Sequence, residues 1–167
     1  MIRIREYRAR DSRKVGELIA ETFGRINLDY ASPEERADLL GPFRFARSDT
    51  HTHAEEIARV LQAEIALVAV DQRDIVGILR GRPNKLQSLF VQIDRLRQGI
   101  GRRLVERFEE ECIAQGAGHV RVMSSLYAVP FYQAMGYKKT TGVRKMHSFE
   151  GEGLQYQPMK KVFTVEG

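Results

Sequence analysis

Hydrophobic residues recur along the chain with two different periods, and each period predicts a different element. Isoleucines alternate with arginines over 2–5, which is typical of a strand. Short apolar runs bounded by turn residues predict buried strands, as on both sides of the turn 71–74. The predicted strands are 2–5, 65–70, 75–82, 86–92, 120–123, 143–149 and 155–163, and the last two form a hairpin around 151–153.

Apolar residues three and four positions apart predict helices between these strands. The clearest example is Leu104, Phe108 and Cys112, which share one face of a helix that follows a glycine-rich turn and ends at Gly116. Capping residues predict the starts of the other helices, and they are Asp11 or Ser12, Ser32, Thr52, and Ser124 or Ser125 before Pro130.

The composition indicates a folded chain of one domain. The 167 residues are 43% hydrophobic and 29% charged, without repeated or low-complexity segments, so they suffice for one buried core. Strands with helices interspersed predict a mixed α/β fold for this domain, 1–167. Its start lacks the apolar core of a signal peptide, no apolar run reaches membrane-spanning length, and Cys112 is the single cysteine. We therefore expect a cytoplasmic protein with no membrane partner.

The net charge of +5 comes from more arginines than lysines, which suits bidentate recognition of phosphate. Nucleic acid is the competing interpretation of a basic chain. Apart from one stretch, however, the basic residues are dispersed, and no nucleic-acid-binding motif accompanies them. We therefore expect no nucleic-acid partner.

That stretch contains a glycine-rich turn, 97–103, between a predicted strand and a predicted helix. Gly99 and Gly101 can adopt positive φ and let a ligand approach the backbone, and N–H groups at a helix start bind anions. A dinucleotide fingerprint would need a third glycine at Leu104, and a P-loop would need Gly-Lys-Ser/Thr where the chain has Gly101-Arg102-Arg103. The turn therefore predicts a pyrophosphate site of another kind.

Arginines cluster around this turn and favour a polyanionic ligand over a plain connector. Two alternatives stay open, because paired glycines are common in strand-to-helix turns and arginines also suit a solvated helix face. The charged residues are Arg95, Arg97, Arg102, Arg103 and Arg107, with Asp94 and Glu106 among them.

One block of the chain reads Leu89-Phe90-Val91, followed at an interval by Gln98-Gly99-Ile100-Gly101-Arg102-Arg103-Leu104. It resembles the acyl-CoA-binding motif of the GNAT superfamily of N-acetyltransferases. The family pattern reads Arg/Gln-x-x-Gly-x-Gly/Ala, and its first position falls on Leu96, where this chain departs from it. Arg95 or Arg97 could supply the missing polar contact.

A second block, 124–137, contains Phe131-Tyr132-Gln133-Ala134-Met135-Gly136-Tyr137. It resembles the later motif of the same family, in which a strand end leads into a short helix with the pattern Phe-Tyr-x-x-x-Gly-Tyr/Phe. A packed aromatic cluster is the alternative interpretation of this block.

The resemblance implies a mixed, mostly antiparallel sheet flanked by helices on both faces. This sheet would be splayed between the strand that ends near Val91 and the strand that ends near Ser124, with acetyl-CoA as co-substrate in the opening. The residues implied in acyl-CoA binding are Phe90, Val91, Arg97, Gln98, Gly99, Ile100, Gly101, Arg102, Arg103, Ser125 and Tyr127. The backbone at Phe90 and Val91 would also polarise the thioester carbonyl.

By the same resemblance, Tyr132 would be the general acid that protonates the departing thiolate. Its alternative is a core aromatic residue with a satisfied hydroxyl. The general base stays open between Glu64, Asp94 and a water relay, because 85–92 contains no carboxylate. His51 and His53 have no third ligand in the sequence, so no metal site is expected.

The resemblance therefore implies an N-acetyltransferase that carries an acetyl group to a primary amine by direct attack. The acceptor is left open among small molecules, peptides and proteins, and a homodimer is left open as well. The alternative function is a non-catalytic acyl-CoA-binding or regulatory module, which would have kept the turn and lost the base.

Overall fold

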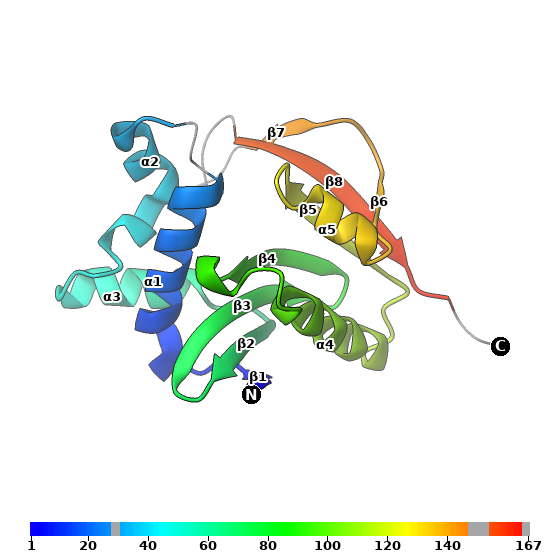
Figure 1. The fold of residues 1–167 in the computed structure, drawn as a ribbon, viewed down its shortest axis with the longest axis horizontal. Coiled ribbons are helices and arrows are strands. Elements are labelled where there is room, and N and C mark those ends of the chain that lie inside the picture. The colour runs from blue at the N-terminus through cyan, green and yellow to red at the C-terminus, as the bar shows by residue number, and fades with distance from the viewer. Residues whose placement is uncertain (28–30, 147–153, 165–167) are drawn as a thin grey trace.

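A computed structural model describes residues 1–27, 31–146 and 154–164 of the chain. Within these residues the main elements are five α-helices and eight strands (Figure 1). The helices are α1 (Ser12–Thr22), α2 (Pro33–Leu40), α3 (His51–Val60), α4 (Ile100–Ala114) and α5 (Val129–Ala134). The strands are β1 (Ile2–Glu6), β2 (Ile65–Asp71), β3 (Asp74–Arg82), β4 (Lys85–Val91), β5 (His119–Ser125), β6 (Lys138–Lys139), β7 (Arg144–Met146) and β8 (Leu154–Val162).

All eight strands form one sheet in the order β1-β2-β3-β4-β5-β8-β6, and β7 pairs with β8. Every pairing is antiparallel except that of β4 with β5. This parallel pairing has only two register pairs, Lys85 with Arg121 and Leu86 with Val122, after which the two strands separate. The prediction of a mostly antiparallel, splayed sheet is therefore confirmed.

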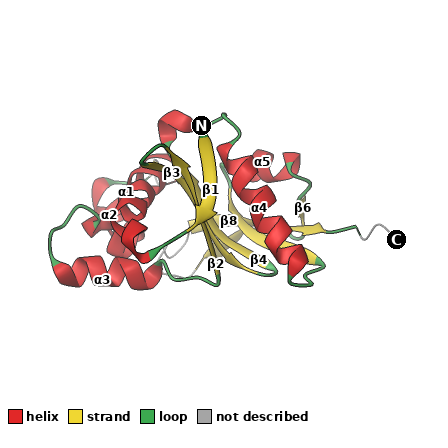
Figure 2. Cartoon of the chain, turned by 90° about the horizontal axis from the view of Figure 1, so that it is seen from below, coloured by secondary structure: helices red, strands yellow, loops and turns green. Residues whose placement is uncertain are grey.

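Helices cover the sheet from both sides (Figure 2). Because side chains alternate along a strand, β2 is buried on both faces: Leu67 belongs to the core under α4, and Val68 to the core under α1 and α3. The helices α1–α3 lie over the half of the sheet that contains β1–β4, and α4 and α5 lie on the opposite face (Figure 2).

Two glycines of β3 allow α4 to lie close to the sheet. A Cβ added at Gly77 would lie 3.0 Å from Leu104, and one at Gly81 would lie 2.8 Å from the ring of Phe108. The predicted apolar face of α4 is confirmed, since Leu104, Phe108 and Cys112 are all 0% exposed. Burial raises the pKa of the Cys112 thiol to about 12, so this cysteine is a core residue and no nucleophile.

The capping predictions hold where the signal is local. Ser32 begins α2 and accepts a hydrogen bond from the Glu35 N–H at 3.2 Å. Asp11 precedes α1, but its carboxylate accepts instead from the Arg8 N–H at 2.8 Å and from the Arg5 guanidinium at 2.8 and 3.0 Å. The third helix, α3, begins after Thr50 rather than after Thr52.

The C-terminal part matches its prediction only partly. The strand predicted over 155–163 is confirmed as β8, whereas β7 covers only Arg144–Met146 of the range 143–149 among the described residues. The turn predicted at 151–153 lies outside the described residues. None of the helices in the described part of the chain is long and apolar enough to cross a membrane.

Candidate active site

The two motif blocks meet where β4 and β5 separate. The glycine turn follows the end of β4 at Val91, and α5 follows the end of β5 at Ser125. A Cβ added at Gly101 would lie 3.3 Å from the ring of Phe131 and 3.7 Å from Val91. The start of α4, the end of β4 and α5 are therefore in contact at the open end of the sheet.

The turn itself is held by its backbone. The Gln92 N–H donates to the Val76 carbonyl at 2.9 Å, and a short 3-10 helix, Ile93–Arg95, follows. Positive φ angles occur at Arg97 (63°) and at Gly99 (79°), but not at Gly101. Of the two glycines, only Gly99 thus needs its backbone freedom, whereas the lack of a Cβ at Gly101 lets α4 approach Phe131 closely.

This helix start offers free hydrogen-bond donors. Gly99 is the N-cap of α4, and the first N–H groups of a helix have no partner within it. The first donor that the helix uses is the Arg103 N–H, which bonds to the Gly99 carbonyl at 3.0 Å. Nothing lies within 4 Å of a Cβ added at Gly99, and Ile100 directs its side chain into the core. The N–H groups up to Arg102 and the positive end of the helix dipole therefore suit an anion.

The arginines are less concentrated at the turn than the sequence suggests. Arg97 and Arg102 are exposed beside it, and Arg102 also lies 3.8 Å from Glu106. Three others have partners elsewhere: Arg95 pairs with Asp71 at 2.8 Å, Arg107 bonds to Glu111 at 3.2 Å, and Arg103 donates to the Ile2 carbonyl at 2.8 Å. Arg97 is thus better placed than Arg95 to supply the contact missing at Leu96.

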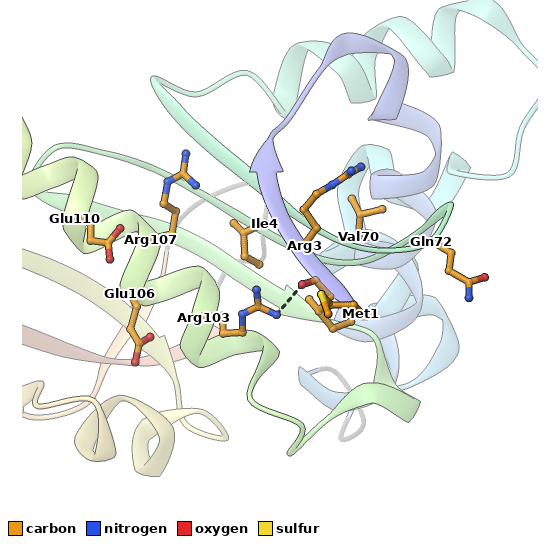
Figure 3. Close-up of a pocket in the computed structure, with 10 residues that line it drawn as sticks. Met1, Arg3, Ile4, Val70, Gln72, Arg103, Glu106, Arg107 and Glu110 are labelled. Carbon is orange, nitrogen blue, oxygen red and sulfur yellow. Dashed lines mark hydrogen bonds between the residues drawn. The ribbon is translucent and has the colours of Figure 1, made fainter.

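Arg103 borders a separate groove between β1 and α4 (Figure 3). This groove has a volume of about 650 Å³, and its lining includes Arg3, Arg107, Glu106 and Glu110. The close-up shows Arg103 directed across the groove toward the first residues of β1 (Figure 3). The Arg103 guanidinium thus contacts β1 instead of the glycine turn, and the Arg103 N–H is used by the first hydrogen bond of α4.

Tyr132 lies in α5 beside the opening and is 4% exposed. Its ring packs edge-to-face against Phe131 and Tyr137, with centroids 5.1 and 5.5 Å apart, and burial raises the pKa of its phenol. Within the described part of the chain the hydroxyl has no hydrogen-bond partner, and no described side-chain oxygen is both fully enclosed and unpartnered. The Tyr132 oxygen therefore lacks the protein hydrogen-bond partner that a core tyrosine with a satisfied hydroxyl would have.

A buried network behind Tyr132 was not predicted from the sequence. Tyr137 donates its hydroxyl to Glu109 at 2.8 Å, and Lys161 donates to the other Glu109 oxygen at 2.7 Å. Burial and the Glu109 carboxylate together raise the pKa of Tyr137. The signal was present, because Glu109 lies four residues after Val105 on the apolar face of α4.

The remaining predicted site residues border the opening in different ways. Phe90 packs its ring edge-to-face against Phe23 at 5.9 Å, and no register pair joins Phe90 or Val91 to β5, so backbone groups there stay available. Ser125 accepts the Ala128 N–H at 3.2 Å and so orders the turn before α5. Tyr127, in that turn, is 60% exposed.

The candidate bases lie at opposite ends of the sheet. Asp94 is exposed and follows β4 at the open end. Glu64 is also exposed, but it precedes Ile65, whose register pair is Gly81 at the end where β4 and β5 are still paired. Asp94 is therefore the carboxylate that the structure places nearer the opening.

The histidines have local partners. His51 pairs with Glu55 at 2.9 Å, and His53 bonds to Ser48 at 2.7 Å and stacks on Phe45.

Comparison with known proteins agrees with this geometry. A family model described as an acetyltransferase (GNAT) domain matches residues 33–163. The chain belongs to the GNAT acetyltransferase family. No curated protein matches it.

Solved structures of GNAT acetyltransferases share the fold over nearly the whole chain. A GCN5-related N-acetyltransferase from Rhodopseudomonas palustris has a TM-score of 0.77 at 22% identity, over 96% of this chain and 95% of its own. The PaiA N-acetyltransferase of Thermoplasma acidophilum, solved with coenzyme A, has a TM-score of 0.71 at 17% identity, over 98% and 99%. The ribosomal-protein-S18-alanine N-acetyltransferase of Escherichia coli has a TM-score of 0.66 at 16% identity, over 100% and 97%.

Membership of the GNAT family confirms several predictions. The protein is an acetyltransferase, its co-substrate is acetyl-CoA, and the splayed sheet is the fold of the family. An enzyme is thereby favoured over the non-catalytic module.

Proposed function

We propose that this GNAT protein, as one domain over residues 1–167, transfers an acetyl group to a primary amine by direct attack. The observation that carries the proposal is the contact between the glycine turn and α5 at Gly101 and Phe131. This contact brings a helix start suited to an anion and the helix that carries the Tyr132 phenol to one opening in the sheet.

The turn is the proposed site for the diphosphate of acetyl-CoA. The donors would be the N–H groups of Gln98, Gly99, Ile100, Gly101 and Arg102, together with the side chains of Arg97 and Arg102. Arg103 is left out, because both its N–H and its guanidinium have protein partners. Ser125 and Tyr127 would border the ligand from the β5 side.

The backbone of Phe90 and Val91 is proposed to align the thioester and polarise its carbonyl. On the side facing β5 these residues have no strand partner, so an N–H group there could stabilise negative charge that develops on the carbonyl oxygen.

Tyr132 is proposed as the acid for the departing thiolate. A phenol with a pKa near 10 facing a thiol near 8.5 is mismatched by about 1.5 units, or roughly 2 kcal/mol. Burial raises the pKa of Tyr132 further, so the phenol is protonated at every working pH. Its role is then to donate a strong hydrogen bond as negative charge builds on sulfur.

The acceptor is proposed to be an amine of low pKa. An α-amino group with a pKa near 8 is about one-tenth neutral at pH 7, whereas a lysine amine is neutral in about one molecule in 2500. Of the two candidate bases, the one nearer the opening is Asp94, and this exposed carboxylate has little means of deprotonating lysine. One structural relative is named for an alanine of a ribosomal protein, an acceptor of this kind.

The test compares a peptide with a free N-terminus against the same peptide with a blocked N-terminus and one lysine. Release of free thiol from acetyl-CoA is followed as a function of pH, with Asp94→Asn and Glu64→Gln as matched variants. We expect kcat/KM to be at least about 10-fold higher for the α-amine and to rise with pH up to the pKa of the acceptor.

Preference for lysine together with a collapse of the rate in Asp94→Asn would show a carboxylate base. Binding of acetyl-CoA without thiol release for any amine would favour the non-catalytic module.

A further inference from the structure

A row of basic residues crosses the sheet from β3 to β6. Four register pairs connect its members in turn: Arg82 pairs with Lys85, Lys85 with Arg121, Arg121 with Lys160, and Lys160 with Lys138. Directly opposed residues point to the same face of a sheet. With strands about 4.8 Å apart, the row of five side chains is roughly 19 Å long.

The row faces away from α4 and α5. Arg121 lies between Val120 and Val122, which are buried in the core under those helices, so its own side chain points to the opposite face. Helix α1 makes its sheet contacts with β3 and β4, and β5, β8 and β6 continue beyond the helices α1–α3 (Figure 1). Arg82, Arg121 and Lys138 are exposed, and Lys85 and Lys160 are partly exposed.

No described carboxylate neutralises this row. None of its five residues forms an ion pair or side-chain hydrogen bond with any residue in the described ranges. Glu64 comes nearest by register, since it precedes Ile65 and Ile65 pairs with Gly81, next to Arg82. The four residues from Lys85 to Lys138 have only basic neighbours along the row.

Such an arrangement lowers stability, because like charges directly opposite one another in a sheet repel. Lysines do protect exposed sheet edges from pairing with other molecules, and this accounts for Lys138 on the edge strand β6. It does not account for Lys85, Arg121 and Lys160, which lie on interior strands. A destabilising row on interior strands is typical of a binding surface.

The surroundings of the row favour a polypeptide partner. Apolar residues flank the central pair: Met123 and Pro158 pair on one side, and Val162 lies on the other, with Met123 38% and Val162 64% exposed. A single-stranded nucleic acid would instead use a series of exposed aromatic rings. Among the described β5 and β8 residues this face carries two aromatic rings, His119 and Tyr156, and both are only partly exposed.

We propose that this open face, with the basic row at its centre, docks an acidic segment of a partner polypeptide. Carboxylates of the partner would relieve the repulsion within the row, and its apolar side chains would cover Met123 and Val162. The proposal is independent of the identity of the amine acceptor.

The test measures binding of a fluorescent decaglutamate peptide by anisotropy at low ionic strength. The paired variant Arg121→Glu with Lys160→Glu reverses the centre of the row, and its matched control is Lys139→Glu with Arg73→Glu. The control makes the same change in net charge at exposed residues outside the row. We expect the row variant to weaken binding by about 10-fold or more and the control by less than about 3-fold.

The neutral variant Arg121→Gln with Lys160→Gln serves as a second test in case the Glu variant does not fold. It removes repulsion within the row, so it should fold, and it should still weaken binding of the peptide measurably. Equal losses in row variant and control would overturn the proposal by reducing it to net charge. Tighter binding of single-stranded RNA or of anionic lipid vesicles than of the peptide, lost with the same row variant, would overturn it in favour of that partner class.

Discussion

The two halves of the sheet differ in how they are covered. Strands β1–β4 lie between α4 on one face and the helices α1–α3 on the other, and their interior is apolar on both sides (Figure 2). In the second half, α5 packs on β5, and on the opposite face Arg121 and Met123 are exposed and Lys160 is partly exposed. The first half therefore holds most of the buried apolar surface, and the second half keeps a face for recognition.

The active site lies at the boundary between these halves. Only two register pairs join β4 to β5, and α4 supports the boundary by packing Leu104 and Phe108 against the first half. From the same helix, Glu109 reaches the second half through Tyr137 and Lys161. The short pairing of β4 with β5 lets the two strands separate, and α4 holds the two halves of the sheet together because it contacts both.

The strongest way to break the boundary site is Gly101→Glu. A side chain there would crowd the Phe131 ring and place a negative charge at the helix start, so we expect affinity for acetyl-CoA to fall by at least about 100-fold. Calorimetry measures the affinity. Gly118→Glu is the matched control, because a Cβ at Gly118 meets nothing within 4 Å. Unchanged affinity in folded Gly101→Glu would show that the turn is only a connector.

Tyr132→Phe tests the other side of the boundary. It keeps the ring that packs against Phe131 and Tyr137 and removes only the hydroxyl. We expect kcat to fall by about 10- to 1000-fold with little change in KM for acetyl-CoA. Steady-state kinetics, with melting curves to verify the fold, measure this. Tyr156→Phe, on the opposite face of the sheet, should leave kcat unchanged, and full activity in Tyr132→Phe would make Tyr132 a packing residue.

The pH dependence of folding stability above pH 10 tests how completely Tyr132 and Tyr137 are buried at the boundary. Burial raises the pKa of both Tyr132 and Tyr137 in the folded state above the unfolded value of 10.0. The folded state then holds these protons more tightly. Their contribution to stability is complete below pH 10 and is lost as pH rises beyond it, by up to about 1.4 kcal/mol per pH unit for each tyrosine. Denaturant unfolding at several alkaline pH values measures the slope, which Tyr132→Phe should reduce.

The smallest expected effect sharpens the contrast between the two faces of the second half. Arg121→Gln removes the central charge from the row, so we expect a rise in Tm of about 1–3 °C at low salt. The rise should vanish at high salt, because exposed charges are screened there. Thermal melts measure it, with Arg73→Gln as the control. A lower Tm in Arg121→Gln would mean that the row is not under repulsion.

What the sequence reveals depends on the range of the interaction. The start of α2 is predicted correctly, because the Glu35 N–H that donates to the Ser32 hydroxyl is only three residues away in the sequence. The splayed sheet is implied by the family resemblance, and in the structure both motif blocks lie at the opening between β4 and β5. Arg103 was assigned to the turn, but it contacts Ile2, which is 101 residues away in the sequence.

The same limit applies to Glu109 and the basic row. Glu109 was missed because its partner Lys161 is 52 residues away, and a carboxylate on an apolar face has no local explanation. The basic row depends on the register of five strands, which periodicity does not determine. Site residues that act through the backbone, such as Val91, leave no side-chain signature at all.

The hydrogen bond from Arg103 to Ile2 has a consequence for the solubility of the protein. Strand β1 is an edge of the sheet, and an edge with unpaired carbonyls invites strand exchange and aggregation between molecules. The Arg103 guanidinium occupies the Ile2 carbonyl at this edge, and Arg3 and Arg5 add charge along the same strand. Arg103 of α4 thereby helps to prevent β1 of one molecule from pairing with a strand of another.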